Sequence, residues 1–75
     1  MKIDGLFIRN LPNDQDNQVF VKAIIDVARG MRKTTVAESV EDLKTLEMLK
    51  GFGVDMVQGY YLEMPHSDLV AVAKV

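Results

Sequence analysis

The chain alternates short β-favouring segments with segments of helical periodicity, and this alternation limits the folds open to it. Three short segments predict strands, at 1–4, 34–37 and 54–57. They recur about every 20 to 30 residues, with an amphipathic segment after each. Consecutive strands separated by a helix pair in parallel through right-handed crossovers. We therefore predict an α/β chain in which three parallel strands alternate with helices.

The longest helix is predicted at about 16–29. Its apolar residues recur at i, i+3, i+4 and i+7 and define one face: Val21, Ile24, Ile25 and Ala28. More apolar residues widen that face: Val19, Phe20, Ala23 and Val27. A face this wide suits a helix that packs on a sheet, and Gly30 lies where a glycine often follows a helix end. Before this helix, we expect four apolar residues to cover part of the core: Leu6, Phe7, Ile8 and Leu11.

Two further helices are predicted downstream. The second covers about 42–50 and ends at Gly51 and Gly53; its buried face comprises Leu43, Leu46, Met48 and Leu49. Ser39 and Asp42 have the spacing of a capping box, although Asp42 alone could also cap this helix. A last helix is expected after Pro65, capped by Ser67 or Asp68; its apolar residues are Leu69, Val70, Val72 and Ala73.

Size and composition restrict the architecture further. The chain has 75 residues, 48% of them hydrophobic, a formal charge of −2 and no cysteine. A disulfide scaffold and a thiol nucleophile are thereby excluded, and the weak acidity argues against a nucleic-acid polymer as partner. We expect no membrane contact from this segment, because it has no run of roughly 20 apolar residues. Three parallel strands cannot close a barrel, and a complete (β/α)8 barrel takes about 250 residues, so by size alone the chain looks like one third of something larger.

Polar side chains follow each predicted strand. Lys2 and Asp4 lie at the end of the first strand, Glu38 follows the second and Gln58 follows the third. Because the carboxyl ends of parallel strands meet at one edge, these residues can converge there. A lysine, an acid and an amide suit a phosphate ester with a metal-bound water. Three plainer interpretations stay open: a surface pair at Lys2 and Asp4, a helix cap or ion pair at Glu38, and a glycine turn after Gln58.

Three stretches of the sequence together resemble one family. KIDG at 2–5, AESVE at 37–41 and QGYYLEMP at 58–65 are similar to the KIDGSF, AEGVE and QGYLFGRP patterns of EAL domains, in the same order and at similar spacing. The stretch between the first two patterns is similar as well. The resemblance covers essentially the whole chain and only the last third of the domain. It implies that 1–75 is the carboxyl-terminal fragment of an EAL domain with no second domain, holding the sixth to eighth barrel strands.

The resemblance implies a function for the strand-end residues. EAL domains are modified TIM barrels that hydrolyse cyclic di-GMP to linear pGpG with Mg²⁺ or Mn²⁺ in a two-metal site. Lys2 matches the catalytic lysine, which contacts the attacking water and the scissile phosphate. Glu38 matches an acidic residue that holds the second metal or the water. The substrate-binding positions are Gln58 and Pro65, and the supporting positions are Asp4 and Glu41.

This sequence also departs from the family pattern. Ser39 replaces a glycine, so it is strained if the position needs a positive φ. Glu63 lies where a basic segment is usual, which puts substrate affinity in doubt. The family's other metal ligands would lie before Met1, so we expect the 75 residues alone to hold no metal stably and to be inactive. A cyclic di-GMP receptor or protein-interaction module without hydrolysis is the alternative, and an unrelated TIM-barrel piece a third interpretation.

Two expectations concern the chain's surroundings. Exposed strand edges predict self-association between copies. We also expect a cytoplasmic location, either alone or as the cytoplasmic part of a larger, membrane-tethered signalling protein.

Overall fold

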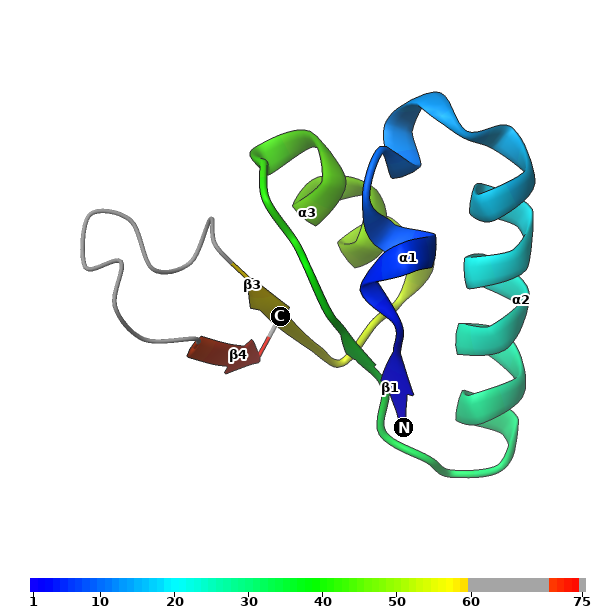
Figure 1. Ribbon diagram of the computed structural model, residues 1–75. Coiled ribbons are helices and arrows are strands. Elements are labelled where there is room, and N and C mark those ends of the chain that lie inside the picture. The colour runs from blue at the N-terminus through cyan, green and yellow to red at the C-terminus, as the bar shows by residue number, and fades with distance from the viewer. Residues whose placement is uncertain (60–70, 75) are drawn as a thin grey trace.

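The computed structural model describes residues 1–59 and 71–74, which form one sheet with helices packed on it (Figure 1). The strands are β1 (Lys2–Ile3), β2 (Val36–Ala37), β3 (Met56–Gly59) and β4 (Ala71–Lys74), in that order across the sheet. The helical segments are α1 (Gly5–Ile8), the 3-10 turn η1 (Leu11–Asn13), α2 (Gln15–Gly30) and α3 (Leu43–Phe52). β1, β2 and β3 are parallel, as the alternation predicts, with helices between them.

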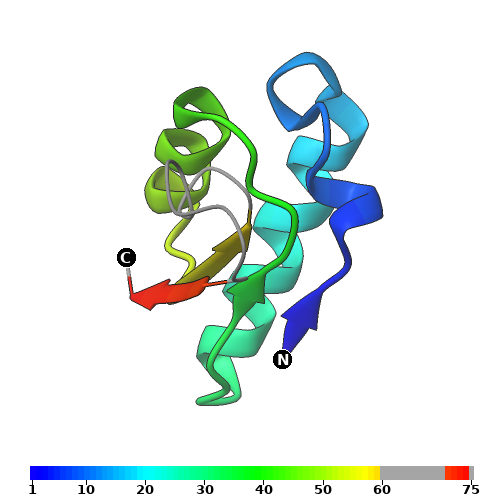
Figure 2. The same cartoon turned by 60° about the vertical axis from the view of Figure 1, so that its left-hand side comes forward.

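The strand register divides the sheet into a buried row and a more accessible row. Ile3 pairs with Ala37, and Ala37 pairs with Val57. These three side chains are at most 3% exposed and belong to the same core as Ile25 of α2 and Leu49 of α3. Because side chains alternate between the faces of a strand, the residues next to them point to the opposite face. The helices therefore close one face of the sheet, as the two views in Figures 1 and 2 show.

The helix α2 is capped by Asp14 and extends slightly beyond the predicted bounds. The Asp14 side chain accepts a hydrogen bond from the Asn17 backbone N–H at 3.0 Å, which caps the first turn. Gly30 is the last helical residue, and the left-handed conformation expected near it falls instead on Arg32, at φ 59°. Only part of the predicted apolar face is buried. Val21, Ile25 and Ala28 lie in the core, whereas Val27 is 61% exposed.

The start of α3 corrects two predictions. Asp42 caps the helix alone, accepting a hydrogen bond from the Thr45 N–H at 2.7 Å. The alternative prediction of a capping box is wrong. A capping box would make Ser39 the N-cap, whereas α3 begins only at Leu43 and Ser39 has a positive φ of 62°. Leu49 is fully buried, whereas Leu43 is 51% exposed. The helix continues through Gly51 to Phe52, beyond the predicted end near residue 50, and Gly53 then ends it with φ 92° in the left-handed region.

The carboxyl-terminal segment contradicts the predicted last helix. Residues Ala71–Lys74 form the strand β4, which pairs antiparallel with β3. The expected cap residues Ser67 and Asp68 lie outside the described residues. An unpaired edge of β3 would leave its backbone N–H and C=O groups without partners from the chain, and β4 satisfies them. Sheet pairing thus overrides the weak helical pattern here.

The connection between β1 and α2 agrees only in part with prediction. Ile8 and Leu11 are fully buried and Phe7 packs against the core, but Leu6 is 68% exposed. Its exposure follows from α1, a single turn that can bury only one side. Phe7 also contacts Phe20 of α2, with ring centroids 4.7 Å apart. No helix in the described ranges, 1–59 and 71–74, has the length and apolarity needed to cross a membrane.

Candidate functional site

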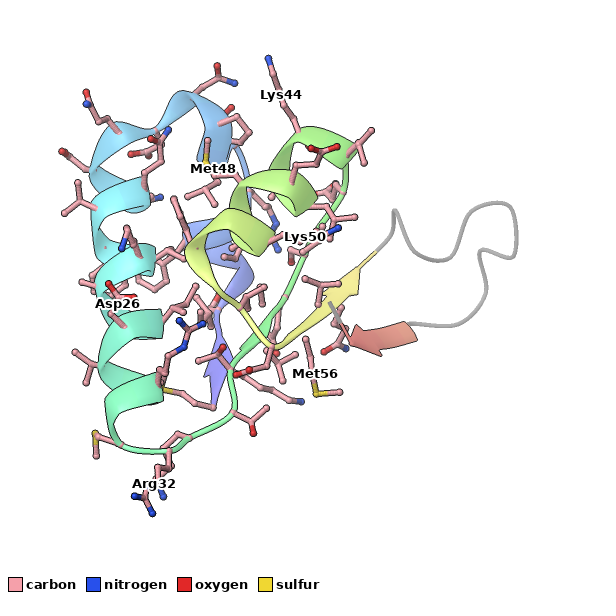
Figure 3. The ribbon with its side chains drawn as sticks, turned by 180° about the vertical axis from the view of Figure 1, so that it is seen from behind. Asp26, Arg32, Lys44, Met48, Lys50 and Met56 are labelled. Carbon is pink, nitrogen blue, oxygen red and sulfur yellow. The ribbon has the colours of Figure 1, made fainter. Side chains whose placement is uncertain are left out.

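The residues predicted at the strand ends lie on the face of the sheet that the helices leave open. Lys2 is exposed and precedes the buried Ile3, and Gln58 follows the buried Val57. The Glu38 N–H donates to the Ile3 carbonyl at 3.1 Å, so the β1–β2 ladder continues through Glu38. By strand alternation, Lys2, Glu38 and Gln58 share the open face. Figure 3 shows Met56, which lies on this face, pointing away from α3.

The register also places these residues near one another. Since Ala37 pairs with Val57, Glu38 and Gln58 come next on neighbouring strands, whose backbones lie about 4.8 Å apart. Lys2 lies on the other neighbour of β2, two residues before the position level with Glu38. The strand register thus places a lysine, a carboxylate and an amide on one face of the sheet, on three neighbouring strands.

One side chain on this face has an unsatisfied acceptor. The Gln58 Oε1 atom is buried and receives no hydrogen bond from the described part of the chain. Such an acceptor costs free energy unless water, a ligand or another segment provides a donor. Gln58 is therefore suited to accept a hydrogen bond from a bound molecule on the open face.

Two close approaches fix the backbone that follows Glu38. Ser39 adopts the left-handed conformation, at φ 62°, and packs against Gly5, where an added Cβ would overlap the Ser39 hydroxyl. The next residue, Val40, donates its N–H to the Gln58 carbonyl at 3.1 Å. A Cβ on Gly59 would overlap the backbone of Val40, so β3 tolerates only glycine at this crossing. The turn after Glu38 is held between α1 and β3, which restricts where the carboxylate can lie.

The sequence did not reveal a polar link at the opposite end of the strands. The Asp55 carboxylate accepts hydrogen bonds from the Thr35 N–H at 2.8 Å and from its hydroxyl at 3.2 Å. Thr35 is 1% exposed, so this link stabilises buried polar groups at the start of β2 and β3. The isolated acid within the apolar segment 54–57 was the only signal of it.

The supporting residues have simpler positions. The Asp4 side chain accepts a hydrogen bond from the Leu6 N–H at 2.8 Å and caps α1. Glu41 is exposed in the connection between β2 and α3. Pro65 lies outside the described residues.

The described residues do not provide the ligand set of a two-metal site. Glu38 is the carboxylate on the open face, and one oxygen of Asp4 is engaged as a helix cap. Within 1–59 and 71–74 there is no group of three or more His, Cys, Asp or Glu side chains placed to hold a metal ion. Two divalent cations need more oxygen ligands than this arrangement offers.

Comparison with known proteins agrees with this arrangement. The family model described as "EAL domain" matches residues 1–65. The chain belongs to the EAL domain family. It is 40% identical over 65 residues to the cyclic di-GMP phosphodiesterase PdeB of Shewanella oneidensis and 37% identical over 65 residues to PdeF of Escherichia coli. Each alignment covers 87% of this chain, and 8% and 9% of those two relatives.

Solved structures give the same result for the fold. The chain superposes with a TM-score of 0.77 on an EAL domain protein from Listeria monocytogenes, at 36% identity. It superposes equally well on the PaMucR phosphodiesterase in complex with cyclic di-GMP, at 38% identity. Both matches cover 81% of this chain and 25% of the other chain. The three parallel strands of this EAL chain therefore correspond to part of a TIM barrel, as predicted.

Proposed function

We propose that this chain forms the carboxyl-terminal third of an EAL phosphodiesterase that hydrolyses cyclic di-GMP to linear pGpG. The observation that carries the proposal is the presence of Lys2, Glu38 and Gln58 together on the open face of the sheet, at the positions of the family pattern. The names of the relatives support the substrate, since PdeB and PdeF are cyclic di-GMP phosphodiesterases.

Each residue has a distinct role in this proposal. Lys2 offsets the negative charge that develops on the scissile phosphate and contacts the attacking water. Glu38 orients that water or holds one Mg²⁺ or Mn²⁺, and Gln58 and Pro65 bind substrate. Asp4 and Glu41 support the loops on either side. The metal supplies a water of lowered pKa when it is bound by a complete site.

The 75 residues alone are expected to bind no metal stably and to hydrolyse nothing. A complete site needs ligands from the remainder of an EAL barrel. The self-association proposed from exposed strand edges involves β1, because β4 already pairs with the outer edge of β3. We place the protein in the cytoplasm, by itself or as the cytoplasmic part of a larger, membrane-tethered signalling protein.

A chimera tests the catalytic proposal. Residues 1–65 replace the matching 65 residues of Shewanella PdeB, which supplies the rest of the barrel. We expect the chimera to convert cyclic di-GMP to pGpG with Mg²⁺ or Mn²⁺, and Lys2→Ala or Glu38→Ala to abolish turnover. Lys44→Ala is the matched control, since Lys44 points outward from the start of α3 (Figure 3). Undiminished hydrolysis by both site variants would sink the residue assignments.

A cyclic di-GMP receptor without hydrolysis is the second candidate, and the conformation of Ser39 favours it. A serine at φ 62° follows Glu38 directly, where the family pattern has glycine. Strain there can displace the carboxylate enough to impair catalysis while substrate still binds. If this candidate is correct, the chimera binds cyclic di-GMP in calorimetry and hydrolyses it poorly, and Ser39→Gly restores turnover.

A further inference from the structure

The strands β2 and β3 are short, so their backbone hydrogen bonds alone fix their register only weakly. β2 has two residues and β3 has four. A slip of one residue between paired strands turns every side chain of one strand to the opposite face. Such a slip would leave Glu38 beside Val57 or Gly59 instead of Gln58. The candidate site therefore depends on a contact that holds these two strands level.

The polar link between Thr35 and Asp55 lies in the same register as the strands. These two residues directly precede Val36 and Met56, which pair with each other. The Asp55 Oδ2 atom accepts the Thr35 N–H at 2.8 Å and the Thr35 hydroxyl at 3.2 Å, and the Asp55 N–H donates to that hydroxyl at 3.3 Å. The Met56 N–H donates to the Thr35 carbonyl at 3.0 Å. Side-chain and backbone hydrogen bonds thus join the two strands at one point.

The link can form in one register only. A displacement of β3 by one residue would bring Val54 or Met56 level with Thr35. A displacement by two residues would bring Gly53 or Val57 there. None of these four residues has a carboxylate, and Thr35 is 1% exposed, so its N–H and hydroxyl would be buried without that acceptor. The observed register avoids this penalty.

We propose that Asp55 is a positioning residue for the candidate site: by binding Thr35 it holds β2 level with β3 and thereby places Glu38 beside Gln58. Glu38 comes three residues after Thr35, and Gln58 comes three residues after Asp55. The link therefore lies about 10 Å from the site along the strands. At that distance Asp55 acts through the strands and not on the substrate. Its effect on turnover rests on the proposed function, whereas its effect on the register does not.

The link and the crossing of Val40 bracket the site along the strands. Beyond the site, the Val40 N–H donates to the Gln58 carbonyl at 3.1 Å, where Gly59 leaves room for the Val40 backbone. That crossing excludes larger side chains, whereas the link holds one specific residue by hydrogen bonds. Without the link, the strands lose their attachment before the site and keep only the one after it.

Nuclear magnetic resonance of the 75-residue chain tests the register. Asp55→Ala should raise amide exchange rates in β2 and at Met56 about tenfold or more and weaken the cross-strand contacts between Ala37 and Val57. Asp55→Asn keeps an acceptor oxygen for both Thr35 donors, so it should preserve both signals. Unchanged exchange and contacts in Asp55→Ala overturn the proposal.

Leu49→Ala is the matched control in this experiment. It removes a fully buried side chain of α3 and lowers stability without touching the link. It should raise exchange throughout the core and leave the cross-strand contacts in place. The same local loss of contacts in Leu49→Ala as in Asp55→Ala would show that the register follows general stability, which also overturns the proposal.

Hydrolysis of cyclic di-GMP by the chimera with PdeB tests the consequence for the site. Per folded molecule, Asp55→Ala should lower kcat about 10- to 100-fold, because a small misplacement of catalytic groups slows the chemical step. Asp55→Asn should retain most of the kcat, and Leu49→Ala should leave it near that of the unsubstituted chimera. Equal kcat per folded molecule in Asp55→Ala and Leu49→Ala would mean that Asp55 only stabilises the fold, and would overturn its positioning role.

The two measurements separate failure of this proposal from failure of the proposed function. Loss of the register in Asp55→Ala, together with an unsubstituted chimera that hydrolyses no cyclic di-GMP, supports the placement of Glu38 by Asp55 and contradicts the phosphodiesterase assignment. An active chimera whose kcat per folded molecule does not respond to Asp55→Ala contradicts the positioning role and supports the assignment.

Discussion

The face of the sheet beneath α2 and α3 is closed by apolar side chains, whereas the opposite face carries Lys2, Glu38 and Gln58. Ile3, Ala37 and Val57 occupy the closed face and are at most 3% exposed. On the opposite face, Gln58 has a side-chain acceptor that the described residues leave unsatisfied. The same strands thus contribute to stability through one face and to binding through the other. Substitutions on the two faces should therefore have different consequences.

The largest effect is expected on the closed face. Leu49→Ala removes a fully buried side chain of α3 and should lower the free energy of unfolding by about 2–5 kcal/mol. For a chain of this size that is a large share of the total stability, about 4–11 kcal/mol. Leu43→Ala, on the same helix but 51% exposed, should change it by less than about 1 kcal/mol. Urea unfolding of both variants measures the difference, and equal losses would mean that burial does not separate the two positions.

The crossing of Val40 over β3 gives the next largest effect. Gly59→Ala forces a methyl group into the Val40 backbone, and we expect a loss of about 2–3 kcal/mol. The control is Gly51→Ala in α3, where an added Cβ meets nothing within 4 Å and alanine should stabilise the helix by up to about 1 kcal/mol. Thermal unfolding measures both. A Gly59→Ala variant as stable as the parent chain would show that the crossing can widen without cost.

Asp42 lies between the two faces along the chain. It follows the turn after Glu38 and caps α3, which packs on the closed face. Asp42→Ala should cost about 1 kcal/mol near neutral pH through loss of the cap. The hydrogen bond from the Thr45 backbone N–H lowers the pKa of Asp42 in the folded chain. Its contribution is therefore complete above the unfolded pKa of about 3.9 and is lost as the pH falls through the lower folded value.

Asp42→Asn separates the cap from the charge. Asparagine also caps helices and does not titrate, so this variant should lose less stability than the parent chain on acidification below about pH 4. Unfolding curves recorded between about pH 2.5 and 6 make the comparison. Identical acid sensitivity of the two chains would show that other carboxylates account for it.

The parts of the fold that local periodicity determines could be predicted from the sequence. The pattern of α2 and the glycine at the end of α3 are local signals, and the order of parallel strands follows from them. The shared face of Lys2, Glu38 and Gln58 then follows from strand alternation. What the sequence alone could not supply depends on partners distant along the chain. Residues 71–74 suit either a helix or a strand, and the edge of β3 decides between them.

Exposure was also hard to predict for the same reason. Leu43 and Val27 recur at the helical spacing of the predicted apolar faces, yet both are more than half exposed. Periodicity predicts the direction of a side chain, but not whether another element packs against it. The link between Thr35 and Asp55 joins residues 20 apart and leaves no local pattern. For Ser39, the glycine of the family pattern indicated that this position could need a positive φ. The structure gives Ser39 a φ of 62°.

A smaller effect is expected from relief of strain beside the open face. Ser39→Gly should raise the free energy of unfolding by about 0.5–1 kcal/mol, because a serine in the left-handed region is strained and glycine is not. Arg32→Gly is the control, since Arg32 has a similar φ of 59° but lies after α2, away from Glu38. Both should raise the Tm by a few degrees, and only Ser39→Gly should alter turnover in the chimera. A loss of stability in Ser39→Gly would indicate that the packing of the Ser39 side chain on Gly5 outweighs the strain.

The smallest effect on stability is expected on the open face itself. Lys2→Met and Glu38→Gln keep the shape of each side chain and remove its charge, and each should change the free energy of unfolding by less than about 0.5 kcal/mol. Neither side chain belongs to the core, and Lys2 is exposed. A loss above about 1 kcal/mol would favour the plainer interpretation, in which these residues form a surface pair or an ion pair that stabilises the fold. Abolished hydrolysis in the chimera with unchanged stability in the isolated chain is the combination that a structural role cannot produce, because a residue needed only for folding would lower both.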